Sequence, residues 1–308
     1  MYFPYLRGRQ FELIAIRELV ENELIGSKVI PIIEPIKPTS TLMKTINLII
    51  EREQKIAVIH NPQVSTYLKA LSNLSSSTLK DGLMNVYESE NVIFSHILNK
   101  KSTAELAAIE EEHSKEDMLL ILNDTEYINY YLNIFDDETP KFTLVPDESS
   151  YRRKIKNNRV LFMDRFTKQQ RNADYYNLED ESYSEDHLYY NEDGYIGFSD
   201  YSIVGADFSE SGFAPYAVVI HMVYFDNDRN LRIKHFVSES NDDINDPAGK
   251  FYEALEKLME WQSEVKLDTF GMKEFAKHYT NGTYPGLGTV KKLSIMHHIE
   301  LVNKFLEE

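Results

Sequence analysis

Ionisable side chains stand at the ends of several apolar segments of this chain, and these residues could do chemistry. Glu34 is an acid within an otherwise apolar segment, and Asp124, Asp164 and Asp200 follow apolar segments later in the sequence. Carboxylate oxygens are the ligands that Mg²⁺ and Mn²⁺ prefer in proteins. We therefore interpret these four acids as candidate metal ligands.

Three basic residues complete the candidate site. His60 ends another apolar segment, and imidazole has the pKa of a general acid or base near neutral pH. Arg7 and Arg9 could clamp a phosphate through their guanidinium forks. A divalent metal with basic groups suits phosphoester hydrolysis. The sequence thus predicts a metal-dependent phosphodiesterase acting on a nucleotide or a nucleic-acid end. A structural alternative stays open, in which Glu34 pairs with an arginine and braces the fold.

The elements that must position these residues alternate along the first two thirds of the chain. Apolar segments that read as strands are separated by segments with the i, i+3, i+4 spacing of helices. The eight predicted strands are 2–6, 29–36, 55–62, 91–98, 117–122, 141–145, 159–163 and 194–201. This alternation predicts a parallel sheet closed into a (β/α)8 TIM-like barrel, with its site at the C-terminal ends of the strands.

The remainder of the chain does not alternate predicted strands and helices in this way. Residues 171–193 are acidic and rich in tyrosine, which indicates a solvated insertion or, alternatively, an acidic docking site. The segments 217–225 and 231–238 alternate apolar and polar residues around a turn, as a hairpin does. Three helical stretches follow, so 214–308 is predicted as a hairpin-plus-helix extension. No linker rich in Ser, Gly or Pro is visible, and we predict a single domain over 1–308.

Two further motifs have structural as well as functional interpretations. His221 and His235 should face each other across the hairpin, whereas His297 and His298 lie about 100° apart on a helix and cannot easily share one ion. The glycine-rich stretch 282–288, which precedes two lysines, superficially resembles an anion cradle but fits no known phosphate-binding motif.

Composition limits the function classes. The 308 residues include 42% hydrophobic residues and no cysteine, which excludes disulfides, thiolate catalysis and Cys-based zinc sites. The formal charge of −17 argues against a protein that coats DNA. No apolar leader and no run of 18 apolar residues is present, so we expect a cytoplasmic protein without a membrane span.

Short motifs at both ends and in the middle resemble the beta protein family of uncharacterised bacterial and phage proteins. They are residues 5–13 (YLRGRQFEL), 30–34 (IPIIE), 198–201 (FSDY), 286–288 (GLG) and 297–298 (HH). The chain departs from the family at Ser199, where a glycine is usual, and in lacking a tryptophan near Val290. The resemblance implies a setting among phage-defence genes beside a partner protein encoded nearby. It also supports an alternative function: a non-catalytic barrel that binds a small ligand or a partner protein and regulates a partner enzyme.

Overall fold

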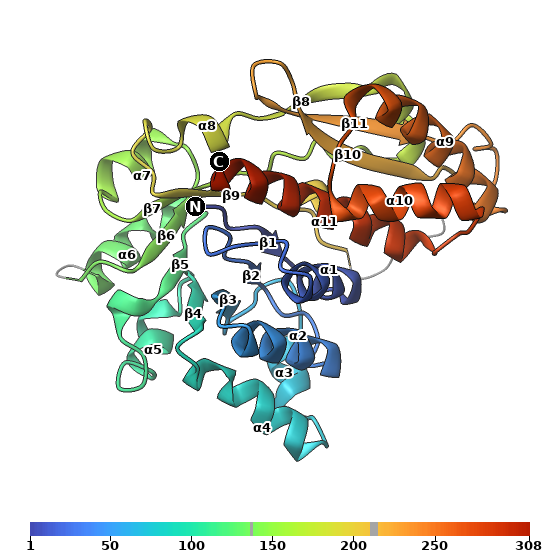
Figure 1. Ribbon diagram of the computed structural model, residues 1–308. Helices are drawn as coiled ribbons and strands as arrows, with labels where there is room; N and C mark the ends of the chain where they lie inside the picture. The colour runs from blue at the N-terminus through green and yellow to red at the C-terminus, as the bar shows by residue number, and fades with distance from the viewer. Residues whose placement is uncertain (136–137, 210–214) are drawn as a thin grey trace. The chain divides into compact units, whose positions relative to one another are not determined.

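The computed structural model describes residues 1–135, 138–209 and 215–308 (Figure 1). The chain forms two compact units. Unit 1 comprises Met1–Met163 and Asp186–Asp200, and unit 2 comprises Asp164–Glu185 and Tyr201–Glu308. The chain therefore leaves unit 1, builds part of unit 2, and returns before the last strand of unit 1. Each unit is described by itself below.

Unit 1 is a nearly closed barrel of eight parallel strands in the order β1-β2-β3-β4-β5-β6-β7-β9. The strands are β1 Tyr5–Leu6, β2 Ile32–Ile33, β3 Ile56–Ile59, β4 Val92–Ile97, β5 Leu119–Ile121, β6 Phe142–Val145, β7 Arg159–Phe162 and β9 Gly197–Ser199. The ring closes where Phe3 N donates to Phe198 O and Tyr5 N donates to Asp200 O, both at 2.8 Å. The predicted TIM-like barrel is confirmed.

Helices follow most of the strands of unit 1, as the alternation predicted (Figure 1). They are α1 Gln10–Glu21, α2 Ser40–Glu51, α3 Tyr67–Ser72, α4 Ser77–Asn85, α5 Ser102–Ala107, α6 Ile128–Ile134, α7 Ser149–Lys154 and α8 Asp186–Tyr189, with 3-10 turns η1 Val86–Glu88, η2 Lys115–Asp117 and η3 Thr125–Tyr127. The strands are buried along their whole length because helices cover their outer face.

Aromatic side chains fill the barrel interior. The Phe3 ring meets that of Phe142 at 4.9 Å between centroids, and the Tyr5 ring stacks on that of Phe162 at 5.2 Å. Alternate residues of a strand point to the same side, so Arg7 continues this inward row at the C-terminal end of β1. The barrel is thus a packed core with a polar mouth.

Unit 2 is built on a three-stranded antiparallel sheet in the order β10-β11-β8. Its elements are η4 Asn172–Asn177, β8 Asp180–Ser184, η5 Ser202–Val204, β10 Val219–Phe225, β11 Leu231–Val237, α9 Pro247–Val265, α10 Phe270–Asn281 and α11 Leu287–Glu307. The predicted hairpin is β10–β11, and its register places His221 opposite His235. The predicted C-terminal helices are α9, α10 and α11.

The acidic insertion is more ordered than its composition indicated. Part of it is strand β8, which pairs with β11. Its carboxylates meet cations of that neighbour: Asp180 pairs with Arg232 at 2.6 Å, and Glu179 pairs with Lys234 at 2.7 Å. The acids therefore serve sheet pairing within unit 2.

Among the helices described, none carries an apolar stretch long enough to cross a bilayer.

Candidate functional site

Glu34 follows β2 and is fully buried at the C-terminal end of the barrel strands. One carboxylate oxygen accepts from the Tyr5 hydroxyl at 2.7 Å and forms an ion pair with Arg7. The other oxygen accepts from the backbone N–H groups of Gln63 at 2.8 Å and Val64 at 3.3 Å. Four donors therefore surround this carboxylate, which joins the first strand, the second strand and the loop after β3.

The turn after β1 brings Arg7 to Glu34. Gly8 has a φ of +63°, and a Cβ there would lie 3.2 Å from the Glu34 carbonyl oxygen. Only glycine fits this left-handed conformation without strain. The Arg7 guanidinium also lies 5.2 Å from the centroid of the Tyr5 ring, and the residue is 9% exposed. This arrangement is the bracing ion pair that the sequence left open as the structural alternative.

The other predicted site residues occupy separate places. Asp124 is exposed and caps η3 by accepting from Glu126 N, while Asp200 is buried and accepts from the Tyr2 hydroxyl at 2.8 Å. Arg9 is half-buried and precedes α1.

Asp164 belongs to unit 2, where it accepts from the N–H groups of Phe166 at 3.1 Å and Ala206 at 2.7 Å. Within the described parts of the chain, no three His, Asp or Glu side chains are placed to hold a metal ion. The role of Glu34, Asp124, Asp164 and Asp200 as metal ligands stays a prediction.

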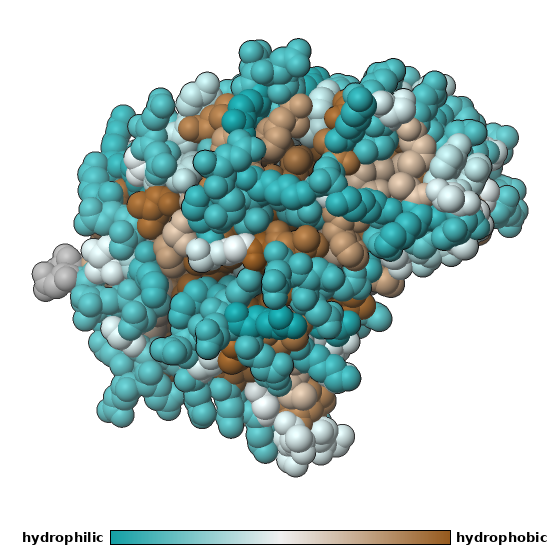
Figure 2. Space-filling view, in the orientation of Figure 1, coloured by the Kyte–Doolittle hydropathy of each residue, from teal (hydrophilic) through white to brown (hydrophobic). Residues whose placement is uncertain are grey.

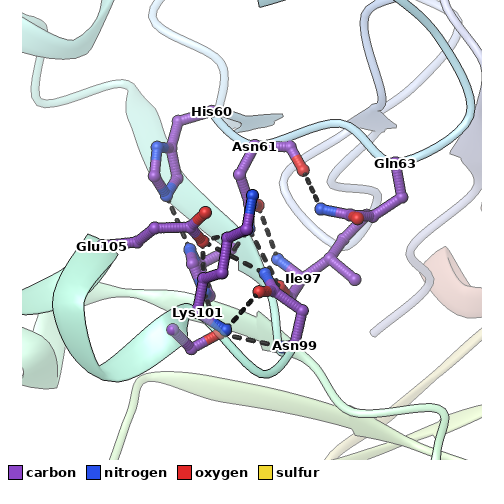
Figure 3. Close-up of polar contacts among 9 residues, drawn as sticks. His60, Asn61, Gln63, Ile97, Asn99, Lys101 and Glu105 are labelled. Atoms are coloured by element: carbon purple, nitrogen blue, oxygen red, sulfur yellow. Dashed lines mark hydrogen bonds and ion pairs between the residues drawn. The ribbon is translucent and has the colours of Figure 1, made fainter.

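His60 lies in a chain of polar contacts that follows β3 and β4 (Figure 3). Its Nε2 is 2.6 Å from Nδ1 of His96, and the Nε2 of His96 is 2.7 Å from the Ser102 hydroxyl at the start of α5. Asn61 anchors these polar contacts to β4, because its side-chain amide accepts from Ile97 N at 2.8 Å and donates to Ile97 O at 2.9 Å.

The same contacts assign the imidazole tautomers. The Asn61 amide orientation is fixed by the Ile97 backbone, so its NH₂ group faces His96 Nε2 at 3.4 Å. A second donor at Nε2 would oppose this NH₂ group; Nε2 is therefore the acceptor, and Nδ1 carries the proton. His96 then donates to His60 Nε2. By elimination, the neutral His60 ring carries its own proton on Nδ1, which points away from the network in Figure 3.

Both imidazoles favour their neutral forms. Burial lowers the pKa of His60 to about 4, and His113 adds a smaller electrostatic contribution in the same direction. Burial, assisted by His60, lowers the pKa of His96 to about 3. Two neutral rings can share the short Nε2–Nδ1 hydrogen bond without the repulsion between charged imidazoles. At neutral pH His60 is a hydrogen-bond donor and a weak base.

A cavity of about 720 Å³ opens beside His60. It lies on the outer side of the sheet, because the Phe94 ring on its wall stacks on His113 at 4.2 Å and meets Tyr87 of η1 at 5.1 Å. His60 contacts the same Phe94 ring at 4.4 Å. His60 thus faces the helical layer, whereas Glu34 faces the barrel mouth.

The cavity has an apolar and acidic lining. Tyr67, Leu68 and Met84 of α3 and α4 contribute apolar surface, and Leu68 and Met84 are 51% and 55% exposed. Hydrophobic side chains reach the otherwise hydrophilic surface in this region (Figure 2). Glu88 and Glu112 supply carboxylates, and of the described residues that line the cavity none is Lys or Arg.

Sequence reasoning found His60 and His96 as candidate acid–base residues, and it missed the aromatic residues around them, Phe94, Tyr87 and His113. The positions of Phe94 and His96 two residues apart on β4 were a usable signal, since such residues share a face of a strand. Tyr87 and His113 carried no comparable signal, because they lie in a 3-10 turn and in the loop after α5.

The chain matches no protein-family model, and no curated protein or solved structure is significantly similar to it. The resemblance to the beta protein family therefore rests on the short motifs, and function has to be argued from the site.

Proposed function

We propose that unit 1 is a ligand-binding barrel whose outer cavity takes a small, flat heteroaromatic molecule, neutral or cationic, and that occupancy of the cavity regulates a partner enzyme. The supporting observation is the lining of the cavity: aromatic rings around Phe94, the imidazole of His60, and carboxylates without a compensating Lys or Arg among the described lining residues. A nucleobase is one molecule of this class.

Charge decides between ligand classes at this cavity. Glu88 and Glu112 repel a phosphate and attract a cation or a ring that donates N–H groups. Tyr87, which lines the cavity beside Phe94, offers the ring on which a planar ligand stacks, and such a contact contributes about 1 kcal/mol beyond burial. A neutral His60 donates a hydrogen bond to a ring nitrogen or carbonyl of the ligand.

Two probes of equal shape and opposite charge test this proposal. Benzamidine is a flat cation and benzoate the matching anion, and adenine serves as a neutral heteroaromatic probe. Binding to the full chain is measured by isothermal titration calorimetry. The double variant Glu88→Gln/Glu112→Gln should weaken benzamidine binding about fivefold, since partly exposed charge pairs contribute up to about 1 kcal/mol each.

Glu111→Gln is the matched control, because Glu111 adjoins Glu112 in sequence but does not line the cavity. Its benzamidine affinity should equal that of the wild type. Failure of both benzamidine and adenine to bind, or an equal loss in the control and double variants, would refute the binding proposal.

The regulatory part rests on the resemblance, which places such genes beside a partner. The test is to assay the enzyme encoded nearby with this chain present, comparing wild type with Glu88→Gln/Glu112→Gln in saturating ligand. Equal partner activity with both proteins would reject regulation through this cavity.

Metal-assisted phosphoester hydrolysis is the second candidate. The observation that favours it is the position of Glu34 and Arg7, a carboxylate and a guanidinium buried at the C-terminal end of the barrel strands, where the sites of such barrels lie. Nucleotide and DNA substrates with Mg²⁺ or Mn²⁺ test it. Turnover by the wild type that is lost in both Glu34→Gln and His60→Gln, with folding unchanged, would favour the hydrolase.

A further inference from the structure

Two histidines face each other across the hairpin of unit 2, and a carboxylate extends the pair. The register of β10 and β11 sets His221 opposite His235, and their Nδ1 atoms lie 2.7 Å apart. The Nε2 of His235 is 3.2 Å from a carboxylate oxygen of Glu181 on β8, which pairs with β11. Glu181, His235 and His221 therefore form a continuous series of hydrogen bonds across the sheet of unit 2.

This series determines which imidazole nitrogens carry protons. Burial lowers the pKa of His235, although Glu181 opposes the shift. Burial also lowers the pKa of His221 well below its ordinary value, and His235 and Lys291 lower it further. Both rings are thus neutral at neutral pH, and each carries one proton.

The order of the protons follows from the carboxylate end. An ionised carboxylate can only accept, so His235 donates to Glu181 through Nε2. The Nδ1 of His235 is then the acceptor, and the Nδ1 of His221 donates to it. The remaining nitrogen of His221, Nε2, carries a lone pair and no proton.

This lone pair belongs to a residue that lines a cavity of about 240 Å³ among η5, β10, the segment before η4 and the N-terminal half of α11. Within the described residues, His221 makes its one hydrogen bond through Nδ1, toward His235. His235 is not among the described residues that line this cavity. The cavity therefore meets the remaining edge of the His221 ring, which includes Nε2.

The surroundings of His221 suit a ring-shaped ligand. The rings of Phe166 and Tyr175 line the cavity with their centroids 5.1 Å and 4.8 Å from that of His221, and Val290 adds a buried apolar wall. A cavity of about 150 Å³ is sufficient for a ring the size of benzene. The larger volume here accommodates one ring with a polar substituent.

We infer that the cavity in unit 2 binds a small neutral ring that donates an O–H or ring N–H hydrogen bond to Nε2 of His221. His235 and Glu181 act as positioning residues, because they keep this nitrogen unprotonated and therefore an acceptor. The site is independent of the cavity proposed in unit 1, where carboxylates favour a cation and His60 is the hydrogen-bond donor.

Two matched pairs of probes test the inference on the full chain: phenol against anisole, and pyrrole against N-methylpyrrole. Calorimetry gives the affinities, and nitrogen-15 correlation spectra of the imidazoles assign the tautomers and report binding at His221. The free protein should carry its protons on Nδ1 of His221 and Nε2 of His235. At least one donor probe should bind about tenfold more tightly than its methylated partner, because the partner leaves a buried acceptor unsatisfied. The pair that shows this preference identifies the donor group as O–H or N–H.

Two variants on different strands remove the preference by different routes. His221→Phe keeps an aromatic ring without the acceptor, so the donor probe should lose its tenfold advantage. Glu181→Lys places an ammonium, which can only donate, beside Nε2 of His235. The tautomers should then reverse, and the Nε2 of His221 becomes a donor that no longer favours phenol or pyrrole. One variant remains informative if the other fails to fold.

Glu185→Lys is the matched control, because it makes the same charge change at the exposed residue directly after β8. It should bind like the wild type, and so should Glu88→Gln/Glu112→Gln, which separates this inference from the function proposed for unit 1. The inference is overturned if neither donor probe binds, if the methylated probes bind as tightly as their parents, or if the spectra place the proton of His221 on Nε2. Tighter binding of benzoate than of phenol and pyrrole at His221 would also overturn it, since Lys168 and Lys291 line the same cavity and would then select the ligand.

Discussion

Replacing Glu34 with glutamine tests whether the ion pair at the barrel mouth stabilises the fold. In the native site one oxygen faces Arg7 and Tyr5, and the other faces two backbone N–H groups. A glutamine has one acceptor and one donor end. Whichever way its amide turns, an NH₂ group meets N–H donors, because a guanidinium and a backbone amide cannot accept.

The size of the effect follows from this mismatch. Glu34→Gln removes a charge-assisted hydrogen bond, which contributes about 1.5–3 kcal/mol, and takes the negative charge away from Arg7, which is 9% exposed. Breaking a buried pair from one side costs about 3–5 kcal/mol. We expect a loss of about 3 kcal/mol, which corresponds to a fall of about 1.5 M in the urea midpoint for an m value of about 2 kcal/mol/M.

The assay is urea unfolding followed by far-UV circular dichroism. Arg152→Met is the matched control, because the pair of Arg152 with Asp147 is exposed, at 43% and 44%, and exposed ion pairs contribute little to stability. The double variant Arg7→Met/Glu34→Gln should lose about 2 kcal/mol less than the sum of its single variants. If Glu34→Gln unfolds at the same urea concentration as Arg152→Met, the reasoning about this pair is wrong.

Three further predictions concern stability. Gly8→Ala should cost at least about 1–2 kcal/mol, since alanine at a φ of +63° is strained and its Cβ would lie 3.2 Å from a carbonyl oxygen; an unchanged urea midpoint would contradict this. Gly271→Ala should cost about 2–3 kcal/mol, because its Cβ would lie 2.4 Å from the carbonyl oxygen of Leu293, where α10 meets α11; calorimetric melting measures it, and a Tm equal to the wild type would exclude this close contact. The folded-state pKa values of His60 and His96 lie at about 4 and about 3, below the ordinary 6.5, so the unfolded chain binds the extra protons as pH falls. Stability should therefore be fully retained above about pH 6.5 and decline as the pH falls from there toward 4; in His96→Gln the decline should be shallower, and an identical pH dependence in the variant would reject the assignment.

The strands of the barrel were predictable because the pattern that indicates each strand lies within a few consecutive residues. Each strand is an apolar run bounded by polar residues, and β2 begins at Ile32, directly after Pro31, which has no N–H to donate to a neighbouring strand. Strand β8 was not predictable in this way. Its residues, Asp180–Ser184, are mostly polar, and they form a strand because β11, more than forty residues later, offers cations opposite the acids.

Some features of the candidate site could likewise be predicted from the sequence, and others could not. Glu34, the isolated acid directly after β2, was found from its apolar context, and its pairing with an arginine was one of two interpretations that the sequence allowed. The outward direction of His60 was not foreseen, because residues that follow a strand can turn either to the barrel mouth or to the helices. Tyr87 and His113 approach Phe94 only through the path of the chain between strands, which no short motif records.

Segments of the two units alternate along the chain, so neither unit can complete its sheet until a later segment has been synthesised. The barrel lacks its closing strand until β9 has been synthesised, and β8, made earlier, has no partner until β11 follows. A nascent chain therefore carries an unpaired β8 edge while the barrel completes, a period in which the acidic side chains of β8 deter pairing with other chains. Shortening the gene at the end of β7 should yield an open, aggregation-prone sheet, and an expression boundary that respects either unit must cut the polypeptide more than once.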